Sequence, residues 1–132
     1  MADTKETLLD SLVSMLGAIP SVTCTRRLKT PQAARDAAPY IGLLASAEEV
    51  IVRDSTHTRW GLTVDLILIV YGEDIEDLIV DVKNIIQSDT LPTGALQMLL
   101  VGQEPVNLIT DDAYSSSRIV VDILYITSRG AN

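Results

Sequence analysis

The sequence has little of the chemistry that most enzymes use. It contains one cysteine, Cys24, one histidine, His57, one tryptophan and no phenylalanine. A single cysteine excludes an internal disulfide, and any imidazole-based triad or metal cluster would have to use His57. The patterns GxGxxG, GxxxxGK[ST], HExxH and CxxC are absent. We therefore predict no catalytic residue, no cofactor and no metal site.

Positive charge is also scarce. Ten Lys and Arg residues face eighteen Asp and Glu residues, so the net charge is −8 and the isoelectric point is near 4.4. This balance argues against affinity for a phosphate backbone, whereas an acidic wall would repel DNA and let it slide past. No window approaches eighteen uninterrupted apolar residues, and the N-terminus lacks a basic flank before an apolar block. We expect a soluble, unexported protein with no membrane partner.

The chain is rich in aliphatic residues. Hydrophobic residues make up 47% of its 132 residues, and almost all of them are Leu, Ile, Val and Ala. A chain of this length buries roughly two thirds of the surface that its unfolded form exposes. We predict one domain over residues 1–132 with an aliphatic core, and a frayed tail over residues 128–132.

The clearest pattern is the alternation from Thr58 to Tyr71. Even-numbered positions from Trp60 to Val70 are apolar, and odd-numbered positions are polar or glycine until Ile67 and Ile69. This pattern predicts a long strand with one face in a core and its second half covered on both faces. The run exceeds the usual strand length of roughly 5 to 6 residues. We expect its polar beginning, His57 to Trp60, to project toward another subunit.

Two segments have helical spacing. In the first, Asp3 and Glu6 form a capping box, and Gly17 with Pro20 ends the helix. In the second, Asp74 is the expected cap and acidic residues crowd the first turn, where the helix dipole stabilises them. Their apolar positions are Leu8, Leu9, Leu12, Val13, Leu16 and Ile19 in the first helix, and Ile75, Leu78, Ile79, Val82, Ile85 and Ile86 in the second.

The remaining segments predict further strands and loops. Leu91–Val101 is compatible with a short helix or a strand, Lys29–Pro39 is an exposed loop with room for one helical turn, Asp54–His57 is a turn, and so is the Ser115–Ser117 run. The expected strands are Ser21–Leu28, Tyr40–Ala45, Glu48–Arg53, Val106–Thr110 and Ser117–Thr127.

The order of these elements predicts the fold class. Strands and helices come in runs instead of alternating one by one, which favours an α+β fold over a parallel α/β fold. We expect a mixed, mostly antiparallel sheet with two main helices packed on it.

Several polar residues are candidates for chemistry. His57 lies beside Asp54, Ser55 and Thr56, but neighbours in sequence rarely form a catalytic geometry, so a solvated loop histidine is favoured. Cys24 has only Arg26 and Arg27 nearby to lower its pKa, which favours a half-buried structural thiol. The acidic pairs Asp111–Asp112 and Asp74–Asp77 lack the oxygen-rich spacing and glycine of a calcium loop.

One basic cluster stands out from the acidic background. Four of the ten basic residues fall in one strand and the loop after it: Arg26, Arg27, Lys29 and Arg35. No stacking aromatic is interleaved, which argues against nucleic-acid binding. A contact with an acidic face of another copy and a solvated sheet edge both remain open.

The layout of the chain resembles the tail terminator proteins of long-tailed bacteriophages, the lambda-type family. The resemblance covers about residues 5–127. It rests on the first amphipathic helix and on five segments: APYIGLLAS (residues 38–46), EEVIVR (48–53), HTRWGLTVDLILIVYG (57–72), EDIEDLIVDVKNII (73–86) and RIVVDILYIT (118–127). Residues 91–110 match the pattern least well.

The resemblance implies a non-enzymatic virion protein in the neck region of the tail, assembled in the host cytoplasm. Such a protein forms a hexameric ring on the tail tube, stops its polymerisation and offers a docking surface to the head–tail connector, while DNA passes through the lumen without specific binding. Another neck or head-completion protein is an alternative, and so is a small cytosolic enzyme or ligand-binding domain that uses His57 with Asp54 or Asp111. The predicted subunit or tube interface consists of Arg26, Arg27, Lys29, Arg35, Arg53, His57, Arg59 and Trp60.

Overall fold

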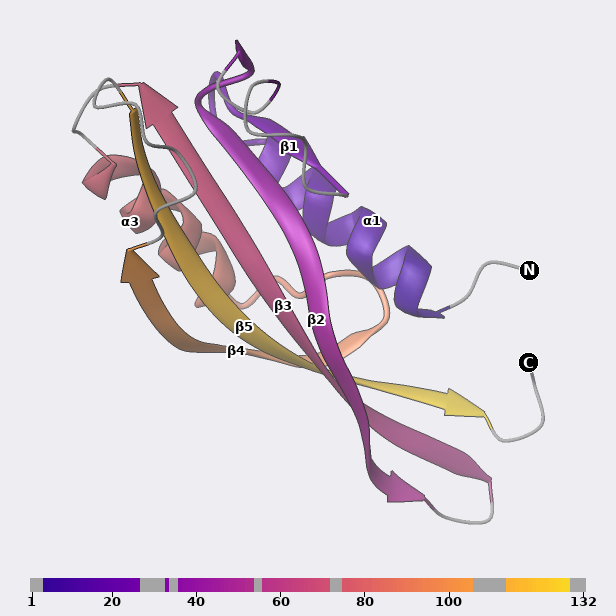
Figure 1. Ribbon diagram of the computed structural model, residues 1–132. Coiled ribbons are helices and arrows are strands. Elements are labelled where there is room, and N and C mark those ends of the chain that lie inside the picture. The colour runs from indigo at the N-terminus through magenta and orange to yellow at the C-terminus, as the bar shows by residue number, and fades with distance from the viewer. Residues whose placement is uncertain are drawn as a thin grey trace.

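The described residues form a five-stranded sheet with helices on one face (Figure 1). The structure is a computed structural model, and it describes residues 4–26, 33, 36–53, 56–71, 75–105 and 114–128. The elements follow the order α1 (Thr4–Gly17), β1 (Thr23–Thr25), β2 (Tyr40–Arg53), β3 (His57–Tyr71), α3 (Glu76–Ile86), β4 (Ala95–Pro105) and β5 (Tyr114–Ser128).

The sheet is mixed and mostly antiparallel. Its strand order is β1-β2-β3-β5-β4, and only the three-residue pairing of β1 with β2 is parallel. The other three pairings, β2 with β3, β3 with β5 and β5 with β4, are antiparallel. With two helices against it, the sheet confirms the predicted α+β class.

The main core lies between the sheet and both helices. The even-numbered side chains of β3 from Leu62 to Val70 are buried there, and so are the odd-numbered side chains of β5 from Ile119 to Tyr125. From α1 and α3 the core receives Leu8, Leu9, Leu12, Leu16, Leu78, Ile79, Val82 and Ile86. Each fully buried Leu or Ile contributes roughly 1.5 to 3 kcal/mol. The buried face predicted for β3 is confirmed.

A second, smaller cluster covers the opposite face of the sheet near one end. Tyr40, Ile67 and Ile69 are buried in it, with Ala37 and Tyr114 packed at its margin. The second half of β3 is therefore buried on both faces, as its unbroken apolar run predicts.

Both helices begin and end close to their expected positions. Asp3 and Asp74, the two expected caps, lie outside the described residues. At the start of α3 the cap position belongs to Ile75, which has no side-chain capping hydrogen bond. Glu76 and Asp77 still place negative charge in the first turn, where the helix dipole stabilises it.

Five predictions, three of strands and two of turns, need correction. The predicted strands Tyr40–Ala45 and Glu48–Arg53 form one strand, β2, because two bulges absorb Ser46 and Ile51 without ending the pairing with β3. The expected turn at Asp54–His57 is wrong at His57, the first residue of β3, and the Ser115–Ser117 run lies in β5. The strand expected over Ser21–Leu28 is only three residues long among the described residues.

The predictions for the remaining segments can be compared with the structure only in part. Leu91–Val101, compatible with a helix or a strand, ends in β4, so the strand alternative is confirmed. Gly94, with φ +93°, takes a backbone conformation that favours glycine just before β4. The predicted strand Val106–Thr110 and most of the loop Lys29–Pro39 lie outside the described residues.

Candidate assembly surfaces

The predicted interface residues fall in two separate parts of the molecule. Arg26 follows β1 and lies against α1, whereas Arg53, His57 and Arg59 belong to the end of the β2–β3 hairpin. Arg27, Lys29 and Arg35 lie outside the described residues. The structure therefore does not bring Arg26 together with the hairpin residues, and the interface role of all eight residues stays a prediction.

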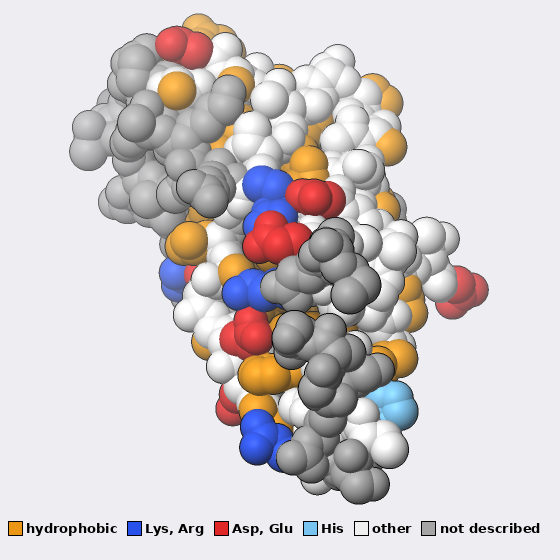
Figure 2. Space-filling model, turned by 90° about the vertical axis from the view of Figure 1, so that its right-hand side faces the viewer, with side chains coloured by type: hydrophobic (Ala, Val, Ile, Leu, Met, Phe, Trp, Pro, Cys, Tyr) orange, Lys and Arg blue, Asp and Glu red, His pale blue; other side chains and the backbone are white. Residues whose placement is uncertain are grey.

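Arg26 connects β1 to α1 through two ion pairs. Its Nη1 lies 2.8 Å from Glu6 Oε2 and 3.0 Å from Asp10 Oδ1. The hydrogen bond to Glu6 is the largest effect that raises the pKa of Arg26 above its ordinary value. Figure 2 shows that other Lys and Arg side chains on that face also lie beside Asp and Glu side chains.

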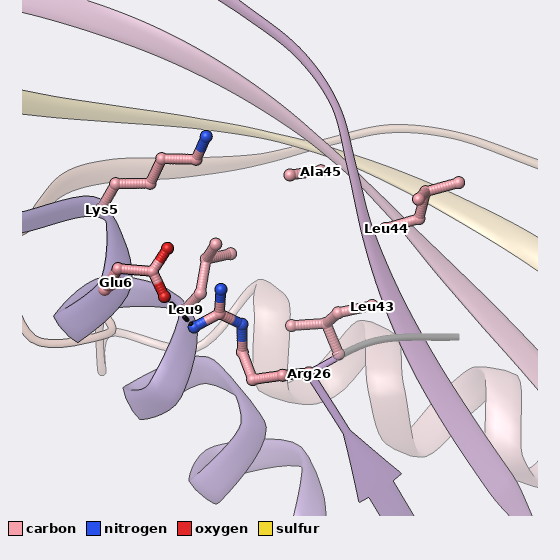
Figure 3. A pocket seen from close by; sticks show the side chains of 7 residues that line it. All are labelled: Lys5, Glu6, Leu9, Arg26, Leu43, Leu44 and Ala45. Atoms are coloured by element: carbon pink, nitrogen blue, oxygen red, sulfur yellow. Dashed lines mark ion pairs between the residues drawn. The ribbon is translucent and has the colours of Figure 1, made fainter. Parts of the chain in front are cut away.

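A pocket opens beside Arg26, between α1 and β2 (Figure 3). Its volume is about 410 Å³, and it is lined by Lys5, Glu6 and Leu9 of α1, by Arg26 and by residues 43–45 of β2. Its cations already have partners within the chain, since Lys5 Nζ lies 2.9 Å from Glu48 Oε2 and Arg26 pairs with Glu6. The pocket thus combines an apolar floor with a rim of paired charges.

The base of the β2–β3 hairpin is held by an aromatic and polar cluster. Trp60 stacks on Tyr125, with ring centroids 6.3 Å apart and an interplanar angle of 12°. Trp60 Nε1 donates to Thr127 Oγ1 at 3.0 Å, and Tyr125 Oη donates to Glu48 Oε1 at 2.9 Å. Since Glu48 also pairs with Lys5, the cluster links α1, β2, β3 and β5. Of these residues, only Trp60 belongs to the interface predicted from the sequence.

Beyond this cluster the hairpin extends past the region that the helices cover (Figure 1). Three consecutive apolar side chains of β2 are exposed there: Val50, Ile51 and Val52, at 43%, 46% and 51%. At the start of β3, His57 is exposed, and its Nδ1 lies 2.8 Å from Thr56 Oγ1. The hairpin therefore offers an apolar stretch next to the basic residues Arg53 and Arg59.

A second group of exposed apolar residues lies on β4 at the other edge of the sheet. Leu96, Leu99 and Val101 are exposed at 49%, 51% and 57%. This group is not predictable from the sequence, because apolar residues occupy both faces of residues 95–101 and show no alternation. Predicting their exposure requires the strand order, because an apolar side chain on an edge strand has fewer neighbours than one in the middle of a sheet.

The described residues offer no metal site and no reactive thiol. They contain no group of three His, Cys, Asp or Glu side chains that could hold a metal ion. Cys24 is half-buried, and burial raises the pKa of its thiol to about 12. Neither α1 nor α3 has the length and apolarity that a membrane-crossing helix requires.

The fold of this chain occurs among solved structures, but no known family or curated protein is similar to its sequence. No protein-family model and no curated protein matches the sequence. Among solved structures, a chain from the virion of a native gene transfer agent particle has the same fold, with a TM-score of 0.67. The similarity covers 96% of this chain and 100% of that chain, at 12% sequence identity. At this identity the similarity shows a shared fold.

Proposed function

We propose that this chain is a non-enzymatic structural protein of a phage-type virion, and that it acts as a tail terminator. The observation that carries the proposal is the similarity to a virion chain over nearly the full length of both chains. A similarity of this extent concerns the whole fold, including the hairpin, and not one common supersecondary motif. The order of segments in the sequence, which resembles tail terminators, supports the same assignment independently.

In this role the chain forms a closed ring on the last ring of the tail tube. The ring stops further addition of tube protein and offers its free side to the head–tail connector. Heterologous contacts between identical subunits close into rings when the rotation between subunits permits. The exposed apolar residues on β2 and on β4 provide two different surfaces on one chain, which is what a heterologous contact needs.

The charge of the chain suits a ring around DNA. With a net charge of −8, the protein gives DNA in the lumen no general electrostatic attraction. In the proposed ring, the predicted interface residues contact a neighbouring subunit or the tube: Arg26, Arg27, Lys29, Arg35, Arg53, His57, Arg59 and Trp60.

Assembly of tail tubes in vitro tests the proposed function. The tail-tube protein of the virus or element that encodes this chain is polymerised with and without the purified protein, and tube lengths are measured by negative-stain microscopy. We expect short tubes with a ring at one end when the protein is present. Tubes that grow to the same length with the protein, and carry no ring, would refute the terminator role.

Another neck or head-completion protein is the second candidate, because the similar chain belongs to a virion, of which the tail is only one part. Such a protein would bind the portal side of the neck and leave tube growth unchanged. A ligand-binding domain based on His57 has less support. His57 does not line the pocket between α1 and β2. The two expected partners of His57, Asp54 and Asp111, lie outside the described residues.

A further inference from the structure

Within the described part of the chain, the sheet has two long edges that carry no further strand. β1 pairs with β2 only at Tyr40, Ile41 and Gly42, so among the described residues no strand pairs with the outer edge of β2 from Leu43 onward. β4 is the last strand at the opposite edge, and its outer side has no described strand partner. Natural proteins usually protect such edges with charges, proline or a covering element, because open edges pair with other chains. Residues 95–103 of β4 contain no charged residue.

The strand directions make the two edges compatible. β2 and β5 run in one direction and β3 and β4 in the other, because all three pairings between these strands are antiparallel. When an identical copy is placed beside the sheet without inversion, β4 of one copy meets β2 of the next in antiparallel orientation. Antiparallel pairing continues the pattern of the sheet and is slightly more stable per residue than parallel pairing.

The two open edges also overlap over most of their length. Following the register across β3 and β5, Gln103 at one end of β4 is level with Leu43, the first open residue of β2. At the other end, Ala95 is level with Val50. Residues 95–103 of β4 therefore lie level with residues 43–50 of β2, whereas residues 51–53 of β2 and 104–105 of β4 extend beyond this overlap. A contact over this length would leave few backbone groups of either edge unpaired.

The surroundings of the β2 edge provide space for the side chains of an added strand. The pocket between α1 and β2 runs beside residues 43–45 (Figure 3), and its floor includes the apolar side chains of Leu9 and Leu43. An added strand would place every second side chain on the helix side of the sheet, toward this pocket. β4 supplies apolar side chains there, such as Leu100, which packs partly against the core.

Charge disfavours one of the alternatives. Glu48 and Glu49 lie in the open span of β2, so pairing of two β2 edges would bring like charges together, which is destabilising. Pairing of two β4 edges carries no such penalty, but it leaves the open β2 edge and its pocket unused. Pairing of β4 with β2 uses both edges and repeats from copy to copy.

We infer that the open edge of β4 in one copy adds to the open edge of β2, residues 43–50, in the next copy, so that one sheet continues through the assembly. This inference rests on the proposed function for its biological role, since it names the contact that would close the terminator ring. The contact itself is a property of the free protein, and it can be tested without tail tubes.

Two edge-blocked variants and one control test the inference. Val101→Lys places a charge on the β4 edge, and Leu44→Lys places one on the open β2 edge. Val80→Lys is the control, because Val80 is an equally exposed apolar residue on α3 at 51%, against 57% for Val101 and 46% for Leu44. Circular dichroism confirms that each variant folds, and sedimentation velocity over a wide concentration range gives its association state.

The expected result is specific to a β4–β2 contact. The natural chain and Val80→Lys assemble beyond the dimer, whereas each edge-blocked variant associates at least about tenfold more weakly. An equimolar mixture of the two blocked variants forms one-to-one heterodimers and nothing larger, since only one open β4 edge and one open β2 edge remain per pair.

Three results would overturn the inference. They are a natural chain that stays monomeric at every concentration, a Leu44→Lys variant that self-associates like the natural chain, and a mixture that forms no heterodimer. A natural chain that is monomeric but still shortens tail tubes would leave the proposed function intact and reject the edge contact. A chain that assembles through its edges but does not affect tube length would support the edge contact and reject the proposed function.

Discussion

Leu66 shows how strongly a single position on β3 commits the chain to its fold. Its side chain is fully buried in the aliphatic core between the sheet and the helices. An ionised carboxylate there would lose its hydration without gaining a partner, which is among the costliest changes a core can undergo. The alternation around Leu66 is visible in the sequence, so this burial is a consequence that sequence analysis reaches without the structure.

We predict that Leu66→Asp unfolds the protein or lowers its free energy of unfolding by at least about 4 kcal/mol. Urea denaturation followed by circular dichroism measures the change. Val80→Asp is the matched control, because Val80 is half-exposed and its substitution should cost less than about 1 kcal/mol. Equal stability of Leu66→Asp and the natural chain would mean that the faces of β3 are assigned wrongly.

Cys24 is a second residue whose surroundings determine its chemistry. Burial raises the pKa of its thiol from an ordinary value of 9.0 to about 12. The fold therefore favours the neutral thiol, and this contribution to stability is complete below pH 9 and is lost as the pH rises toward 12. The thiolate is the reactive form, so the folded chain holds Cys24 unreactive near neutral pH.

We predict that alkylation of Cys24 by iodoacetamide at mildly alkaline pH is at least about tenfold slower in the folded protein than in the chain unfolded by urea. Mass spectrometry of the modified fraction over time gives both rates. A free thiol compound added to each sample corrects for the effect of urea on the reagent. Comparable rates in the two states would contradict the assigned burial of the thiol.

At the scale of elements, the β2–β3 hairpin differs from its sequence prediction in an instructive way. The run ASAEE interrupts the alternation of β2, and this interruption predicts two strands with a break between them. The backbone instead places Ser46 and Ile51 in bulges, which shift the side-chain alternation without ending the hydrogen-bonded ladder. A bulge and a break look alike in a side-chain pattern, because only the partner strand distinguishes them.

Gly61 and Ile51 are coupled within this hairpin. A Cβ atom built on Gly61 would lie 3.1 Å from Ile51 Cδ1 and 3.3 Å from its Cγ1. Glycine within a strand often marks such a close approach. The bulge at Ile51 thus places its side chain directly over the glycine of the neighbouring strand.

We predict that Gly61→Val lowers the free energy of unfolding by roughly 1 to 2 kcal/mol, because the added atoms displace Ile51. In an Ile51→Ala background the same substitution should cost about 0.5 to 1 kcal/mol less, as expected for residues in contact. Urea denaturation of the two single variants and the double variant completes the cycle. Strictly additive effects would show that Ile51 does not lie over Gly61.

Other elements were predictable to different degrees, for physical reasons. α3 and β5 have strong periodicity, and both were predicted within a few residues. β4 was ambiguous because apolar residues occur at both faces from Leu96 to Val101. The candidate surfaces were harder to predict, because nothing local in the sequence tells which strands form the edges of a sheet. The pairing of Arg26 with Glu6 and Asp10 likewise depends on how β1 packs against α1.

At the scale of the whole molecule, one sheet combines a well-packed interior with two exposed apolar edges. The helices cover one face, the small cluster around Tyr40 covers part of the other, and the apolar residues of β2 and β4 remain at the margins. Such an arrangement is stable as a folded unit but leaves surface that favours association. This division between core and edges, together with the fold of a virion chain, is the basis for the proposed ring.

The central claim is that the chain terminates a tail tube, and its position in the particle tests this claim most directly. The measurement is electron cryomicroscopy of particles purified from the virus or element that encodes the chain, with this fold placed into the density. The proposed function predicts a ring of copies at the capsid-proximal end of the tail tube, between the last tube ring and the connector. Density for the chain against the portal, with none on the tube, would contradict it and support a head-completion role.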